Sequence, residues 1–85
     1  MPEISRFFGV VIYMYFDDHA PPHFHAEYGD EEVLVRIDDL SILRGRIHPR
    51  ALGFVMEWAS LHKADLMRAW SEAEAHEKPG KIMPL

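Results

Sequence analysis

The chain has 85 residues, no cysteine, 48% hydrophobic residues and a formal net charge of −5 at pH 7. This length predicts a single domain over residues 1–85 with a modest core, and the absence of cysteine excludes disulfides and thiolate metal sites. The negative charge disfavours broad binding to nucleic acid, because such binding needs many Lys and Arg side chains to neutralise phosphates.

The longest apolar run is FFGVVIYMYF, at residues 7–16. It is rich in β-branched and aromatic residues without polar alternation, which is typical of a central strand covered on both faces. The run is ten residues long, whereas a helix that spans a bilayer needs about 20, and its flanks lack the pattern of a signal peptide. We therefore expect no membrane segment and a cytoplasmic location.

The segment DDHAPP, residues 17–22, ends this strand, because consecutive prolines cannot continue a hydrogen-bonded ladder. The next segment, HFHAEYG, alternates as a half-buried strand does. One face carries Phe24, Ala26 and Tyr28, and the other carries His23, His25 and Glu27. The pattern predicts a stiff loop that leads into a strand with both histidines on one side.

A hairpin turn is expected at GDEE, residues 29–32, before a second alternating segment, VLVRID. The apolar LSIL that follows, residues 40–43, predicts either a fourth strand or an irregular entry to a helix. Residues 1–48 are thus mainly β, in three or four antiparallel strands.

Residues 49–76 predict one long helix, with a bend near Lys63 as an alternative, because Pro49 suits a first helical turn and no proline follows until Pro79. The apolar arc of this helix is wider than packing against one small sheet requires. It therefore indicates either a protein partner or a cover formed by the extended tail at residues 77–85. The stripe consists of Ala51, Val55, Trp58, Ala59, His62, Leu66, Ala69 and Ala73, flanked by Leu52, Phe54, Leu61 and Trp70.

His23 and His25 form the candidate site. Their side chains share one face of an extended strand, so both rings can reach one ion at about 2.0–2.1 Å. A third ligand would be His19, an Asp of the proline loop, or His62, and zinc is the natural ion for such a set. The alternative is structural: the two histidines lie on the solvent side of the strand and hydrogen-bond to Asp17, Asp18 or carbonyls.

The basic segment RGRIHPR carries Arg44, Arg46 and Arg50 and no acid. It predicts a contact for an anion or an acidic partner, or simply a solvated entry to the helix. Metal-free catalysis is a further alternative, in which His23, His25 or His48 acts as general base and one of these arginines holds a phosphate.

The blocks PEISRFFG, DDHAPPHFHA and EWASLH resemble the small bacterial domain-of-unknown-function family four-one-six-zero, and the resemblance covers nearly the whole chain. It implies a compact α+β domain, often encoded beside a small protein of another uncharacterised family in the manner of a toxin–antitoxin pair. The implied toxin role is an association and not an activity.

These observations together predict an α+β domain whose three- or four-stranded antiparallel sheet packs on a long C-terminal helix. The leading functional hypothesis is a toxin-like component of a two-gene module that binds a small partner protein, with any active site at His23 and His25. The alternatives are a metal-dependent hydrolase or nuclease that uses His19, His23 and His25, and a non-catalytic binding module. Self-association is the alternative to a separate partner, and whether the chain is an enzyme is left open.

Overall fold

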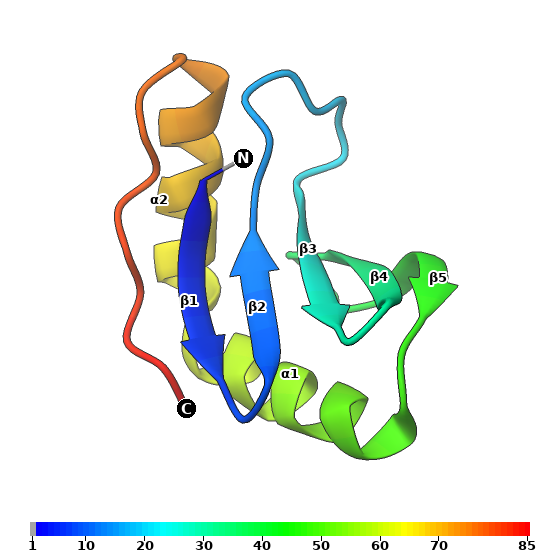
Figure 1. The fold of residues 1–85 in the computed structure, drawn as a ribbon. Helices are drawn as coiled ribbons and strands as arrows, with labels where there is room; N and C mark the ends of the chain where they lie inside the picture. Colours follow the sequence, from blue (N-terminus) through cyan, green and yellow to red (C-terminus); the bar gives the residue numbers. More distant parts are fainter. Residues whose placement is uncertain (1) are drawn as a thin grey trace.

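The computed structural model describes residues 2–85, which form an α+β fold with one antiparallel sheet packed on two helices (Figure 1). The predicted class is confirmed, but the described residues contain five strands and two helices where three or four strands and one helix were expected. The strands are β1 (Glu3–Phe7), β2 (Val10–Tyr13), β3 (His23–Tyr28), β4 (Glu31–Arg36) and β5 (Ile42–Arg46), and the helices are α1 (Pro49–Leu61) and α2 (Lys63–Glu74).

The apolar run at residues 7–16 is not one strand, because a tight turn divides it. Phe7 pairs with Val10, and the two residues between them, Phe8 and Gly9, have φ angles of 48° and 82°. Two consecutive left-handed residues give the twist that joins antiparallel strands in a two-residue hairpin. The expected central strand is therefore the hairpin of β1 and β2, and β2 alone lies inside the sheet.

The strands follow one another in sheet order from β1 to β5. The predicted apolar face of β3 is confirmed at Phe24 and Ala26, which are fully buried, but not at Tyr28, which is 37% exposed at the end of the strand. The segment that sequence left open is a strand, β5, which lies at the sheet edge and is exposed throughout.

The predicted helix is interrupted at His62. This residue has φ −128° and ψ 26°, outside the helical region, so α1 ends at Leu61 and α2 begins at Lys63, beside the expected bend. Pro49 opens α1 as predicted, and the His48 ring accepts a hydrogen bond from the backbone N–H of Arg50. No described helix has both the length and the apolar character needed to cross a membrane.

The C-terminal segment covers the apolar arc of the helices. Its Ile82 is buried and donates its backbone N–H to the Ile4 carbonyl at 2.8 Å, while the Trp58 indole donates to the Met83 carbonyl at 2.8 Å. Figure 1 shows this segment running alongside β1. Trp58 and Trp70 are both buried. The tail thus covers part of the arc, in which Leu61 remains 67% exposed, and neither tryptophan is exposed as an interface anchor.

Candidate metal centre

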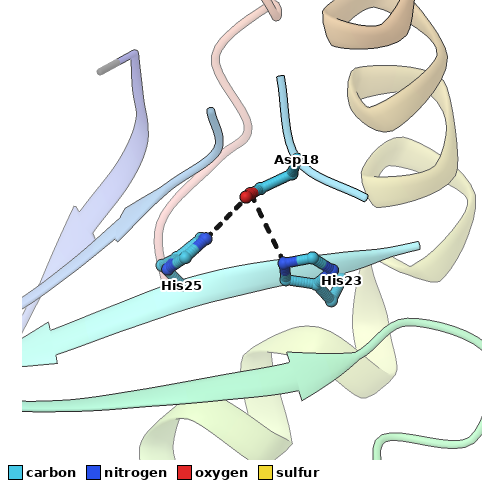
Figure 2. A group of neighbouring side chains, drawn as sticks. All are labelled: Asp18, His23 and His25. Atoms are coloured by element: carbon cyan, nitrogen blue, oxygen red, sulfur yellow. Dashed lines mark hydrogen bonds and ion pairs between the residues drawn. The ribbon is translucent and has the colours of Figure 1, made fainter. Parts of the chain in front are cut away.

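Asp18, His23 and His25 come together at the start of β3 (Figure 2). The histidines share a face because they are two apart on a strand, and the loop that follows β2 brings Asp18 over them. One nitrogen of each ring and one oxygen of the carboxylate all lie within 4.8 Å of one another. Asp18 Oδ2 is 2.8 Å from His25 Nε2 and 3.4 Å from His23 Nε2.

Both histidines are buried, each only 6% exposed. The structural alternative is therefore wrong about their solvent-side position, although the hydrogen bonds that it predicts, to Asp18 and to a carbonyl, are present. The His25 ring stacks on Tyr13 at 5.1 Å between centroids and meets Tyr15 edge-on at 4.7 Å. The His23 ring lies 5.2 Å from the Trp70 ring of α2. Aromatic side chains therefore fix both rings and exclude water from most of their surface.

The hydrogen bonds of His23 determine which of its nitrogens can bind an ion. Nδ1 lies 2.8 Å from the Pro21 carbonyl oxygen, which can only accept, so Nδ1 carries the proton. In the neutral ring, Nε2 therefore presents a lone pair toward Asp18. The backbone carbonyl plays the orienting part that usually accompanies a metal-binding histidine.

A neutral His25 ring cannot donate a hydrogen bond to both of its acidic neighbours, Asp18 and Glu32, and this leaves an unfavourable contact that we call the conflict at His25. Nε2 lies 2.8 Å from Asp18, whereas Nδ1 is buried without a hydrogen-bond partner among residues 2–85, and Glu32 Oε2 is 3.4 Å from it. A proton on Nε2 leaves the Nδ1 lone pair facing Glu32, and a proton on Nδ1 leaves the Nε2 lone pair facing Asp18. Either tautomer thus places a lone pair against a carboxylate.

Double protonation would relieve this conflict, but burial acts against it. Loss of solvation lowers the pKa of His25 below its ordinary value of 6.5, outweighing the hydrogen bond and the charge of Asp18, which raise it. The neutral ring is the form that binds metals. A cation between the three ligand atoms would satisfy both Nε2 lone pairs and the carboxylate together.

Glu32 is held beside His25 by a second contact. The Tyr13 hydroxyl donates to Glu32 Oε2, the same oxygen that approaches His25 Nδ1. Tyr13 and His25 are paired across β2 and β3, and Glu32 reaches them from β4. Neither Tyr13 nor Glu32 was among the residues predicted for the site, because only the sheet register brings them to the ring.

His19, the first candidate for a third ligand, is exposed on the loop and lies outside the group. Its neighbour Asp18 is the third member of the group instead. Sequence offered only an unspecified Asp of this loop. His62, the other candidate, is half-buried, and its ring nitrogen is 3.2 Å from Asp65. The geometry thus selects Asp18 among the candidate third ligands.

The three arginines are divided between two places. Arg44 pairs with Leu34, which pairs with His25, so Arg44 lies on the same sheet face as His25 but two strands away. Arg46 pairs with Glu32 on that face. Arg50 lies in the first turn of α1, next to His48, whose ring caps the helix. They do not form one cluster around the histidines.

The fold and the site define a small α+β protein with a buried cluster of two histidines and one aspartate on a sheet strand. The chain belongs to the family described as Domain of unknown function (DUF4160), whose profile matches residues 9–71. No curated protein and no solved structure matches it. The match includes Asp18, His23 and His25, and the family description assigns no role to them.

Proposed function

We propose that Asp18, His23 and His25 bind a divalent metal ion of the zinc class and that the protein is a metal-dependent hydrolase. The observation that carries this proposal is the convergence of two imidazole nitrogens and one carboxylate oxygen within 4.8 Å. Two histidines and one carboxylate form the ligand set of several catalytic zinc sites. Burial favours the neutral, metal-binding form of His25.

Three protein ligands leave room in a four-coordinate shell for one further group. The side chains of His23 and His25 are 8% and 7% exposed, whereas that of Asp18 is 19% exposed. Access is therefore from the Asp18 side. An ion at this position would act as a Lewis acid that activates water for hydrolysis, and the aromatic rings around both histidines would keep bulk water away from its other side.

The toxin-like role and the small protein partner remain predictions. The family resemblance implies the toxin-like role, and the wide apolar arc of the helical region favours a partner. The buried Ile82 shows that the C-terminal segment covers part of that arc. Metal-free catalysis by a histidine and an arginine is less well supported. Arg44 and Arg46 lie on β5, two strands from His25, and the His48 ring beside Arg50 already accepts a hydrogen bond as the cap of α1.

Zinc titration of the metal-free protein by calorimetry tests the proposal. We expect one ion per chain and a rise in the thermal midpoint with zinc, since a ligand that binds only the folded state stabilises it. His23→Ala and His25→Ala should each lower the affinity by more than roughly a hundredfold, because loss of a ligand should exceed the 10–100-fold cost of losing an orienting group.

His19→Ala is the matched control, because His19 lies on the same loop region but outside the group. It should leave zinc affinity unchanged. Absence of zinc binding in the wild type, or an equal loss in all three variants, would contradict the proposed site.

A further inference from the structure

A surface hollow opens next to Asp18, the most exposed of the three proposed ligands. Its volume is about 370 Å³, and its walls include Tyr15, Phe16 and Asp18. A second hollow, of about 450 Å³, shares Phe16 and Pro2 with the first and extends to Lys78 and Lys81. The two hollows are neighbours, because Pro2 and Phe16 line both of them, and together they extend from Asp18 to a pair of lysines on the C-terminal segment. We call the surface along these two hollows the path.

The chemistry of the walls changes along this path. Asp18 marks the end at which an ion would lie. Tyr15 and Phe16 follow, and these residues are 36% and 37% exposed. At the far end Lys78 makes no ion pair within residues 2–85, and Lys81 Nζ is 4.0 Å from Glu3. The order is therefore metal site, aromatic surface, cationic end.

We propose that this path binds a short single-stranded oligonucleotide, with one phosphate at the metal, a base on Phe16 and the next phosphate at Lys78 and Lys81. The inference rests on the proposed metal site, because Asp17 and Asp18 would repel a phosphate unless an ion compensated their charge. A single strand alternates phosphates with stackable bases, and aromatic side chains bind such bases without regard to sequence.

The net charge of −5 agrees with a contact of this small extent. A long nucleic acid would be repelled by the rest of the surface, whereas two lysines and one ion can hold adjacent phosphates locally. Free inorganic phosphate would leave the aromatic surface uncovered. A mononucleotide would place only one phosphate, so it should bind more weakly than an oligonucleotide.

The test uses a thymidine tetranucleotide, titrated at low salt into the full chain with zinc and, separately, with a chelator, and followed by NMR shifts of backbone amides. We expect zinc-dependent binding with shifts at residues 15–18 and 78–81. Phe16→Leu should weaken it by roughly tenfold, from the loss of one stacked base. Replacing both lysines by Gln should reduce the slope of log affinity against log salt by about 0.7, the value for the one phosphate that the two lysines contact.

Two controls are matched to these changes. Tyr28→Leu removes an aromatic ring of the same 37% exposure at the other end of β3, and Lys63→Gln removes a lysine whose Nζ donates to the Asp38 carbonyl. Neither should alter tetranucleotide binding.

Calorimetry on the same samples separates the two proposals. Zinc binding without tetranucleotide binding overturns only the oligonucleotide inference, and failure to bind zinc overturns the proposed function. Tetranucleotide binding that is unchanged in the Phe16 and lysine variants overturns the assigned path. Equal affinity for inorganic phosphate, or for thymidine monophosphate, also overturns it, because neither ligand needs a second phosphate contact.

Discussion

At the level of single residues, the position of Glu32 gives the site an orienting carboxylate. If an ion occupies the site, His25 must use Nε2 as a ligand and carry its proton on Nδ1, which lies 3.4 Å from Glu32 Oε2. A carboxylate in that place fixes the tautomer and the ring orientation of a metal-binding histidine. Tyr13, which donates to the same oxygen, holds Glu32 there.

Glu32→Gln should therefore lower zinc affinity by roughly tenfold or more without abolishing it. Calorimetric titration measures the change, and ¹⁵N NMR of the His25 ring should show the proton on Nδ1 in the zinc-bound wild type. Glu31→Gln is the control, since it removes an acid from the next position of β4, whose side chain points to the other face. Equal affinity of the Glu32 variant and the wild type would remove Glu32 from this role.

The lowered pKa of His25 predicts a pH dependence of folding in the absence of metal. Burial keeps the pKa of folded His25 below its ordinary value of 6.5, although Asp18 opposes this. Between the two pKa values the unfolded chain binds a proton that the folded chain does not, so stability from this residue is complete above about pH 6.5 and declines as pH falls below it. The urea midpoint should drop as the pH falls through about 6.5, the ordinary pKa of histidine.

His25→Gln should flatten this dependence, whereas His19→Gln, an exposed histidine outside the group, should leave it as in the wild type. The acids facing His25 are Asp18 and Glu32, and His23 is its cationic neighbour when protonated. An equally steep decline in the His25 variant would assign the dependence to those groups instead.

The pairing of His23 with His25 could be predicted from sequence because strand periodicity alone sets it. The third residue could not, because the position of Asp18 depends on how the loop from β2 to β3 folds back. Burial of the histidines was also missed, since it comes from Tyr13, Tyr15 and Trp70, which approach from separate elements. Local patterns carry no information about such contacts.

At the level of elements, the hydrophobic periodicity failed to predict the backbone at two positions, Phe8 and His62. Phe8 occupies a left-handed turn position that Asn or Gly normally fills, so the apolar run at residues 7–16 concealed a hairpin. The Phe8 ring packs on Phe54 at 4.9 Å, which gives a packing reason for a large residue there. At His62, no Gly or Pro marks the break between α1 and α2. The sequence therefore predicted one long helix and offered a bend near Lys63 only as an alternative.

The pairing of β5 with β4 shifts register between Leu34 and Val35, and the close approach of the two strands can be tested at Gly45. Gly45 has φ 77°, and a Cβ added there would lie 2.3 Å from the Glu32 carbonyl oxygen, whereas Gly29, with φ 62°, has open space around it. Gly29→Ala should cost about 1–2 kcal/mol from backbone strain alone. Gly45→Ala should cost roughly 3 kcal/mol or more, because the clash adds the price of overpacking.

Urea denaturation of both variants measures the difference, and the comparison separates strain from steric contact. The Gly45 variant should also weaken zinc binding, because a clash that is relieved at β4 displaces the backbone of Glu32. Equal destabilisation of the two variants would show that β5 can shift freely away from β4.

At the scale of the whole molecule, the C-terminal segment completes the fold. One edge of the sheet, β1, receives a hydrogen bond from Ile82, while the other edge, β5, is exposed over its whole length. Sequence predicted both a partner and this tail as covers for the helical arc, and composition could not decide between them. The Trp58 indole shows that the tail covers part of this arc, since its hydrogen bond goes to the Met83 carbonyl within the chain, and a partner stays a prediction.

Ile82→Asp should consequently destabilise the protein by about 3 kcal/mol, because it places a carboxylate where the side chain is only 6% exposed. Met83→Asp is the matched control, since that side chain is 74% exposed and only its backbone carbonyl is used. The second change should cost less than about 0.5 kcal/mol.

Urea denaturation followed by tryptophan fluorescence suits both variants, because Trp58 lies under this segment. Size-exclusion chromatography should show self-association of the Ile82 variant alone, as the arc and the edge of β1 become accessible. If the two substitutions had the same small effect, the segment would contribute little to the fold, and the helical arc would again require a cover from a second protein.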